Sequence, residues 1–306
     1  MTKIIFRFLV FAFVFYINTA FNFASAQTTC NANGTSGSPI TLANGSACYS
    51  QADEIKMTIY KIYLCTSSPT APTTSTPINL SSCTQIFNNS TGAVATLNAT
   101  TINNPPQLSG NSINGLPLQN GNQYTYSYIE FSPSGQLVKS TKAFNVPHTG
   151  ADGSSGTFCW TGTSSVYAWS TALPTSVSSC GNSYTAGGYV TTMLNSLGGT
   201  GPFSATASFN NVGPTLDVTL NAYLMDSTYK LPVTGTRDSM GTVITLGAVY
   251  PLTTAITYNS STQDGLITAI NFSWGEEIFR QGGTTFFMGG PISVKFSAHC
   301  KNQNPC

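Results

Sequence analysis

Charged side chains are scarce in this sequence. Asp, Glu, Lys and Arg together make up 7% of the chain, and 11 basic residues nearly balance 10 acidic ones. Such sparse, balanced charge provides no basic patch, which removes the usual electrostatic driving force for binding nucleic acid or anionic lipid. Nucleic acid is therefore excluded as a partner. Because 41% of the residues are hydrophobic, a packed core is nevertheless expected rather than disorder.

Histidine is scarcer still, since only His148 and His299 occur. A serine hydrolase needs a histidine to accept the serine proton, and no serine lies in a G-x-S-x-G elbow. His299 lies on the polar face of a predicted strand. His148 lies in a glycine-rich stretch, four residues before Asp152, and we expect it to be a solvated loop residue. The sequence therefore predicts no catalytic residue, and we do not expect an enzyme.

Paired carboxylates are the usual machinery of glycoside hydrolysis, and the adjacent pair here is Glu276 and Glu277. They follow a predicted strand that ends at Trp274. Neighbouring strand residues point to opposite faces, so these two are not expected to flank one sugar bond. The alternative is that one of them pairs in space with Glu130 or Asp226. Three aromatic residues would either stack on sugar rings or fill the core: Trp160, Trp169 and Trp274.

Signals for metal and cofactor binding are missing as well. The chain has no C-x-x-C pair, and its two histidines offer few imidazole ligands for zinc. The calcium-loop pattern D-x-[DN]-x-[DN]-G is absent, and the stretch around Asp152 offers a single carboxylate. We therefore predict no metal site and no cofactor.

The N-terminus has the three parts of a secretory signal peptide. Lys3 and Arg7 form a basic start, Phe8–Ile17 is apolar, and Ala24-Ser25-Ala26 is a cleavage signal. The apolar run is shorter than the roughly 20 residues of a spanning helix, and no later segment is long and apolar enough. We predict cleavage before Gln27, no stable membrane span afterwards, and an extracellular or cell-surface location, with the periplasm as the alternative.

All eight cysteines lie in the predicted mature chain, and an even number in an exported protein indicates disulfides. Eight cysteines allow 105 pairings, among which sequence alone does not decide. The spacing favours pairing between neighbours, which gives Cys30–Cys48, Cys65–Cys83, Cys159–Cys180 and Cys300–Cys306.

Apolar residues alternate with polar ones in several segments. Leu216–Leu224 and Ile292–His299 follow this period of two, which is typical of half-buried strands. Thr242–Tyr250 and Leu266–Trp274 are apolar on both faces, as central strands are. The best helical segment, Tyr189–Leu197, is short and flanked by glycines. The predicted fold class is all-β, an antiparallel β-sandwich or sandwiches stabilised by disulfides.

Turn residues predict how some strands are connected. Ser132-Pro133-Ser134-Gly135 separates the strands Tyr124–Phe131 and Leu137–Val146 and is expected to close a hairpin. A tract rich in Pro, Thr and Ser between Cys65 and Cys83 is expected to form an extended exposed loop.

The polar, glycine-rich stretch Pro147–Gly156 marks a candidate domain boundary. The predicted organisation is a signal peptide at 1–26, an N-terminal β-sandwich domain at 27–147 and a C-terminal β-rich domain at 148–306. The alternative is a single domain in which this stretch is a long surface loop, and the sequence leaves both readings open.

One pattern resembles secreted bacterial β-sandwich domains of unknown function. The residues are "ADEIKMTIYKIYLCTSS", the later Cys83, and "LPLQNGNQYTYSYIEF". In those domains a K-x-x-x-Y-K strand ends at a cysteine, a second cysteine follows a short loop, and G-x-x-Y-T opens another strand. The resemblance covers about the first half of the mature chain. It implies an exported bacterial β-sandwich and transfers no catalytic residues.

Two functions are compatible with this sequence. The first is a secreted or cell-surface structural or adhesive protein, such as a subunit of a surface layer or filament, whose exposed edge strand pairs with a neighbour. The second is a secreted domain that binds or hydrolyses carbohydrate through its tryptophans and Glu276 or Glu277. The corresponding partners are further copies of the chain or a surface glycan. The first fits better because no cluster of ionisable groups stands out.

Overall fold

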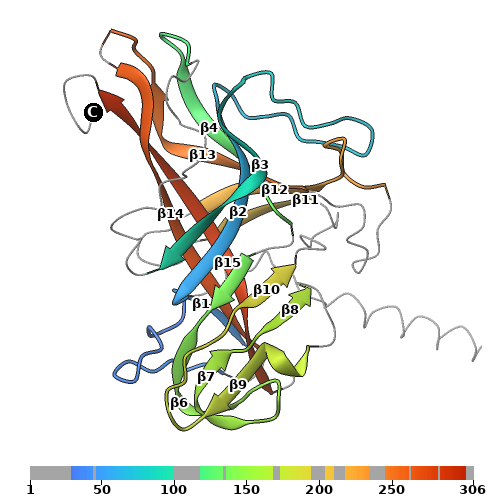
Figure 1. Ribbon diagram of the computed structural model, residues 1–306, viewed down its shortest axis with the longest axis vertical. Coiled ribbons are helices and arrows are strands. Elements are labelled where there is room, and N and C mark those ends of the chain that lie inside the picture. The colour runs from blue at the N-terminus through green and yellow to red at the C-terminus, as the bar shows by residue number, and fades with distance from the viewer. Residues whose placement is uncertain are drawn as a thin grey trace, which may run out of the picture.

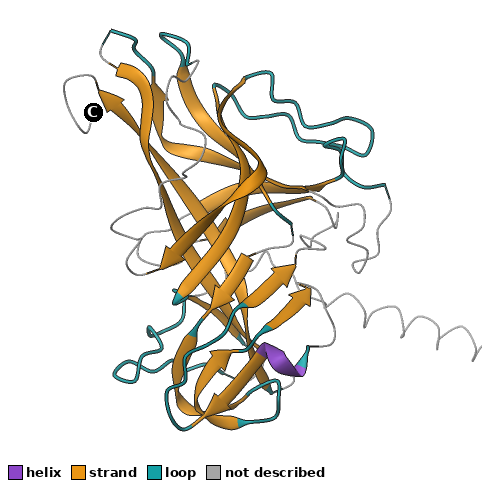
Figure 2. Cartoon of the chain, viewed as in Figure 1, coloured by secondary structure: helices purple, strands orange, loops and turns teal. Residues whose placement is uncertain are grey.

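The computed structural model describes residues 29–43, 46–98, 118–133, 136–167, 173–193, 204–209, 218–233, 245–261, 263–281 and 283–300. The predicted signal peptide and Cys306 lie outside these ranges. Strands form nearly all of the regular structure, and the helix among the described residues is one 3₁₀ turn, η1 (Thr175–Val177) (Figure 2). The all-β prediction is confirmed. In the described residues, no helix has the length and apolar character needed to cross a bilayer.

The larger of two sheets is centred on β2 (Glu54–Cys65), which pairs with three other strands. β3 (Cys83–Asn98) occupies one edge of β2, and β4 (Gln123–Phe131) and β5 (Gln136–Lys139) follow one another along the other edge. Beyond β4 and β5 lie β13 (Thr245–Thr257), β12 (Val218–Met225), β11 (Ser204–Phe209), β10 (Val190–Met193) and β8 (Ser164–Tyr167). The pairs are antiparallel except β8–β10, which is parallel.

The second sheet has six strands in the order β1-β14-β15-β6-β7-β9. β14 and β15 form its longest pair and run along most of the molecule, while β6, β7 and β9 lie together at the lower end of the view (Figure 1). β15 also contacts β5, β12 and β13 of the nine-stranded sheet. The bounds are β1 (Ala47–Ser50), β6 (Thr141–Thr149), β7 (Ser155–Thr161), β9 (Ser178–Gly181), β14 (Gln263–Gln281) and β15 (Thr284–Cys300).

Two of the short segments that carry the chain from one sheet to the other are those that enter β2 and β6. Gln51–Asp53 joins β1 of the six-stranded sheet to β2 of the nine-stranded sheet. Ser140 alone separates β5 of the nine-stranded sheet from β6 of the six-stranded sheet. Both crossings place polar backbone and side chains between packed layers, where each polar group needs a partner.

The predicted hairpin at Ser132–Gly135 is wrong. β4 and β5 both run antiparallel to β2, with Phe131 opposite Ile59 and Lys139 opposite Glu54. The two strands are therefore successive parts of one path along β2 and not the two arms of a hairpin. Pro and Gly mark bulges as well as turns, so their presence did not establish that the chain reverses.

The stretch Pro147–Gly156 forms the end of β6, a tight turn and the start of β7. The turn is closed by a hydrogen bond from the Gly150 amide to the Ser154 carbonyl, at 2.8 Å. Gly153 has φ +83°, a left-handed conformation that favours glycine. The division at residue 147 stays a prediction, and both sheets contain strands from both sides of it.

Other predicted strands are confirmed where the chain is described. β12 and β13 contain the described parts of Leu216–Leu224 and Thr242–Tyr250. β14 does not end at Trp274 but continues to Gln281, and β15 includes all of Ile292–His299. The segment between Cys65 and Cys83 is a mostly exposed loop with one isolated bridge, between Thr70 and Asn79, as its composition predicts.

Three disulfides join neighbouring cysteines: Cys30–Cys48, Cys65–Cys83 and Cys159–Cys180. The second and third connect residues directly opposite each other, in β2–β3 and in β7–β9. Pairing of Cys300 with Cys306 stays a prediction because Cys306 lies outside the described residues. Three disulfides are compatible with an oxidising extracellular or periplasmic location.

Candidate functional site

Two clusters pair a lysine with a buried glutamate. The junction cluster consists of Asp53, Lys142 and Glu276 with the hydroxyls of Ser50 and Ser140. The tyrosine cluster consists of Lys61, Glu130 and Tyr229 with the neighbouring Tyr63 and Tyr128. Because charged residues are rarely buried unless they are paired, these clusters are the first places to look for chemistry.

Glu276 is the centre of the junction cluster and is completely buried. It lies on β14, opposite Ser50 of β1 in the strand register. The Ser50 hydroxyl donates to Glu276 Oε1 at 2.9 Å, and the Ser140 hydroxyl donates to the same oxygen at 2.8 Å. The end of β1 and the crossing residue Ser140 thus each contribute a donor to one carboxylate.

Lys142, the second residue of β6, completes this cluster. Its Nζ lies 3.2 Å from Glu276 Oε1 and 3.4 Å from Asp53 Oδ1, and it donates to the Gln51 carbonyl at 2.5 Å. The other oxygen of Asp53, Oδ2, accepts the backbone amide of Thr141 at 2.9 Å. The carboxyl of Asp53 is thereby held beside the amine by a backbone contact as well as by charge.

The side chains of the cluster differ in exposure. Lys142 exposes 4% of its side chain and Glu276 none, whereas Asp53 exposes 42%. Burial raises the pKa of the Glu276 carboxyl, and the Lys142 ammonium only partly opposes this effect. Burial by itself would lower the pKa of Lys142, but Glu276 and Asp53 hold it above its ordinary value. An amine and a carboxyl group, both with raised pKa values, therefore face each other in a site largely closed to water.

The loop closed by Cys30–Cys48 covers Lys142. Gly34 has φ +73°, and a Cβ at this position would lie 2.7 Å from Lys142 Cδ, so a larger residue would be strained and would displace the lysine stem. The Gly34 carbonyl accepts the Ala143 amide at 2.7 Å, and Ile40 donates to the Ala143 carbonyl at 2.8 Å. These backbone contacts hold the loop against β6.

The tyrosine cluster lies within the nine-stranded sheet. Lys61 on β2 is directly opposite Glu130 on β4, and Lys61 Nζ lies 3.1 Å from Glu130 Oε2. Lys61 also donates to the Tyr229 hydroxyl at 2.5 Å, and its Nζ lies 4.9 Å from the centre of that ring. The register of β2 shifts between Ile59 and Lys61.

Electrostatics at the tyrosine cluster follow from burial. Burial raises the pKa of the Glu130 carboxyl above its ordinary value, against the lowering effect of Lys61. The pKa of Tyr128 is also raised by burial and by the nearby Glu130 charge. Lys61 remains 26% exposed, and its neighbours Tyr229 and Glu130 keep its pKa above the ordinary value in spite of partial burial.

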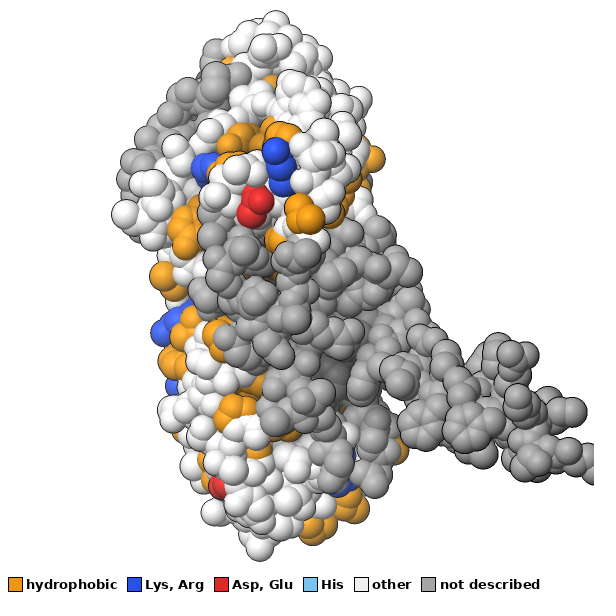
Figure 3. All heavy atoms as spheres, turned by 90° about the vertical axis from the view of Figure 1, so that its right-hand side faces the viewer, with side chains coloured by type: hydrophobic (Ala, Val, Ile, Leu, Met, Phe, Trp, Pro, Cys, Tyr) orange, Lys and Arg blue, Asp and Glu red, His pale blue; other side chains and the backbone are white. Residues whose placement is uncertain are grey.

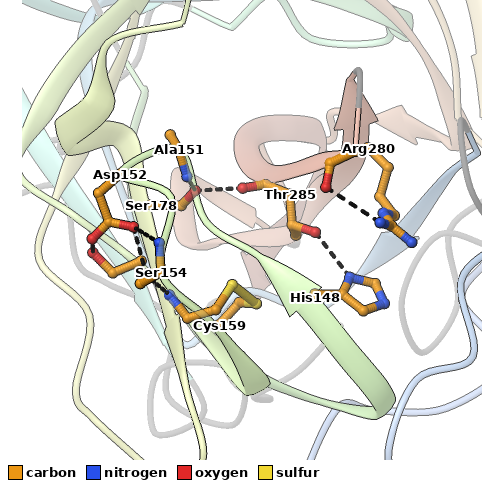
Figure 4. Close-up of a disulfide and its surroundings, with 11 residues drawn as sticks. His148, Ala151, Asp152, Ser154, Cys159, Ser178, Arg280 and Thr285 are labelled. Atoms are coloured by element: carbon orange, nitrogen blue, oxygen red, sulfur yellow. Dashed lines mark hydrogen bonds between the residues drawn. A yellow bond between two sulfur atoms is a disulfide. The ribbon is translucent and has the colours of Figure 1, made fainter.

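His148 is not the solvated loop residue that the sequence predicts. It lies in β6 and is 1% exposed. Its ring stacks on Phe144 with centroids 3.9 Å apart, and its Nδ1 lies 2.8 Å from Thr285 Oγ1. Figure 4 shows His148 and Arg280 on the same side of Thr285. Burial, assisted by Arg280, lowers the pKa of His148 to about 4, so the ring is neutral near pH 7.

Two other acids considered from the sequence are turn residues. Asp152 accepts the Ser154 amide and hydroxyl and the Ser179 hydroxyl, and Asp226 accepts the amides of Thr228 and Lys230. These bonds stabilise local turns. Within the described ranges, no group of three or more His, Cys, Asp or Glu residues could hold a metal ion.

The structure does not bring Glu276 together with Glu130. Glu276 lies in the six-stranded sheet and accepts from Ser50 and Ser140, whereas Glu130 pairs with Lys61 in the other sheet. Trp160 lies half-buried on β7. Trp169 and the side chains of Trp274, Glu277 and His299 lie outside the described part.

Sequence reasoning missed Asp53, Lys142 and Lys61. The available signal was the scarcity of charge, because a lysine in a strand of such a chain is a candidate for an internal ion pair. "STKAF" around Lys142 and "IYKIY" around Lys61 each place a lysine among strand-forming residues. The partners come from distant strands and could not be assigned without the fold.

Comparison with known proteins adds no assignment, since no family model, curated protein or solved structure matches the chain. A functional assignment therefore depends on the geometry of the molecule itself.

Proposed function

We propose that this chain is a secreted or cell-surface structural or adhesive protein whose copies associate through a strand edge. The observation that carries the proposal is the position of β3. This strand has 16 residues, starts at the disulfide-bonded Cys83 and, in the described part of the chain, pairs with β2 alone. A long strand that pairs with a neighbouring strand along one edge can accept a strand of another molecule along its other edge.

The surface chemistry supports an extracellular structural role. Figure 3 shows one face of the molecule, and its described part has few charged side chains. Polar uncharged groups and backbone cover most of that part. Several charged side chains instead form internal pairs, as Lys142 does with Glu276. Disulfides make unfolding harder, which suits a protein that persists outside the cell.

A solution assay tests association through β3. The mature protein is examined over a range of concentrations by light scattering and negative-stain microscopy, and we expect oligomers or filaments. Val94, 63% exposed on β3, is changed to Lys, because edge lysines oppose strand addition. The matched control is Val233→Lys, at a site that is 77% exposed and outside the strands.

Val94→Lys should reduce assembly, whereas Val233→Lys should leave it unchanged. A protein that stays monomeric at every concentration would contradict association through β3. If that monomer also binds members of a polysaccharide panel, the carbohydrate-binding alternative replaces the proposal.

A further inference from the structure

We propose that the junction cluster forms a covalent cross-link: an amide bond between Lys142 Nζ and Asp53 Cγ, with Glu276 as the acid–base catalyst. This inference does not depend on self-association, because the bond lies within one chain. It follows from three side chains that occupy one site and have complementary chemical roles: an amine, a carboxyl acceptor and a second carboxyl group that can move protons.

The geometry brings the reacting groups together. Lys142 Nζ lies 3.4 Å from Asp53 Oδ1, which is bonded to the carbon that would be attacked. Asp53 is prevented from turning away by the Thr141 amide, which donates to its other oxygen at 2.9 Å. An amine held beside a carboxyl group reacts with it faster than a free one does, because the entropy of bringing the two together is already lost.

The reaction balances without an external reagent. Glu276 Oε1, 3.2 Å from Nζ, takes a proton from the Lys142 ammonium and leaves a neutral amine. The amine attacks Cγ of Asp53 and forms the C–N bond. Glu276 delivers the proton it took to the departing Asp53 oxygen, which also receives the second amine proton. The C–O bond breaks, one water leaves, and Glu276 returns to its starting state.

The surroundings act on both partners of this transfer. Burial penalises charge and raises the pKa of the Glu276 carboxyl, which prepares it to hold the proton. Glu276 and Asp53 hold the pKa of Lys142 above its ordinary value, so removal of its proton is the step for which a catalyst is needed. The Cys30–Cys48 loop lies over the lysine stem through Gly34 and limits water there. The partial exposure of Asp53 gives the released water a path to solvent.

The position of the bond gives it a mechanical consequence. Asp53 ends the crossing from β1 to β2, and Lys142 follows the crossing from β5 to β6. The bond would tie both crossings together and hold the two sheets at their junction. The tyrosine cluster has a Lys61–Glu130 pair but a tyrosine hydroxyl in place of a second carboxyl group, so the same reaction is not expected there.

Intact-mass measurement of the full exported protein, after reduction of its disulfides, tests the proposal. The mass should be lower by one water, about 18 Da, than that of the same chain without the bond. Proteolysis should then release one branched peptide that contains Lys142 and Asp53 and resists reduction. A full mass with two separate peptides overturns the proposal, as does a water loss located elsewhere in the chain.

Variants assign the roles of the three residues. Lys142→Arg and Asp53→Ala should each abolish the branched peptide, and Glu276→Gln should slow its appearance at least tenfold. The matched control, Lys61→Arg, changes the other buried pair and should leave the branched peptide intact. Circular dichroism reports whether each variant folds. A folded Glu276→Gln protein that is linked at the wild-type rate would overturn the catalytic role of Glu276.

Discussion

The junction cluster and the tyrosine cluster use the same ion pair in different surroundings. Lys142 exposes 4% of its side chain and contacts two carboxyl groups, that of Asp53 in a crossing segment and that of Glu276 on β14. Lys61 exposes 26%, faces Glu130 across one strand pair, and has a tyrosine as its other partner. One pair therefore lies where two sheets meet, and the other lies within a single sheet.

This difference teaches how a chain with few charges uses them. A cross-strand pair can be lost while the backbone ladder around it remains, because the strands are also held by backbone hydrogen bonds. At the junction, the chain leaves one sheet for the other, and side chains satisfy groups that no ladder reaches. We expect the junction cluster to contribute more to the free energy of unfolding than the tyrosine cluster does.

The largest expected effect comes from removing the junction lysine. Lys142→Ala leaves Glu276 buried without its nitrogen partner and also prevents the proposed bond to Asp53. The loss, measured by urea denaturation, should therefore reach at least about 3–5 kcal/mol of unfolding free energy, which is the cost expected for breaking a buried pair. Lys61→Ala should cost less, because Lys61 is partly exposed and Glu130 keeps the Tyr229 hydroxyl nearby. Equal losses in the two variants would contradict the comparison.

A double variant separates lost charge from lost packing at the junction. Lys142→Met with Glu276→Leu removes both charges and keeps apolar volume, so it should recover part of the stability lost in Lys142→Ala. Recovery would remain incomplete if the proposed Lys142–Asp53 bond forms in the wild-type chain, because the double variant cannot make it.

The next effect concerns pH and a site outside both clusters. The folded-state pKa of His148 is about 4, against an unfolded value near 6.5. Between these values the unfolded chain binds the proton and the folded chain does not. Stability due to His148 is therefore lost as pH falls from about 7 to about 4, by roughly 2–3 kcal/mol.

Thermal unfolding of wild type and His148→Gln across this pH range isolates the contribution. The difference between the two proteins should change with pH and level off above pH 7. The comparison with His148→Gln is needed because burial also raises the pKa of Glu276. Protonation of Glu276 stabilises the folded chain as the pH falls, which is opposite in sign to the effect of His148. A pH-independent difference would show that His148 titrates normally in the folded chain.

A smaller effect is expected at the loop that covers Lys142. Gly34→Ala introduces a Cβ at a positive φ and 2.7 Å from Lys142 Cδ, and should cost about 1–3 kcal/mol. Gly121→Ala is the control, because Gly121 has φ +81° but no atom within 4 Å of the added Cβ. The excess loss in Gly34→Ala, measured by chemical denaturation, reports the close approach to Lys142.

The smallest effect is expected within the tyrosine cluster. Tyr229→Phe keeps the ring over Lys61 but removes the hydroxyl that accepts from its Nζ. A half-exposed hydrogen bond of this kind contributes about 0.5–1.5 kcal/mol. Ser140→Ala removes a hydroxyl that donates to the buried Glu276, and it should cost more unfolding free energy than Tyr229→Phe does. A larger loss in Tyr229→Phe would reverse the order of the two clusters.

Local pattern was sufficient for several parts of this structure. Alternation of apolar and polar residues identified the strands that contain Val218–Leu224 and Ile292–His299. Successive side chains of a strand face opposite sides of the sheet, so a half-buried strand alternates in its sequence. Spacing favoured three disulfides that the structure contains, since each joins the nearest available cysteines. The exposed loop between Cys65 and Cys83 followed from its Pro, Thr and Ser content.

Only the tertiary structure decided the remainder. Whether the chain reverses or continues after Phe131 depends on pairing with β2, which lies far away in sequence. The burial of His148 depends on Phe144 and Thr285. Asp53, Lys142 and Glu276 come together because two crossing segments meet β14. Contacts between distant segments carry no local periodic signal, so composition and spacing determined the strands, whereas the meeting of the sheets determined the site.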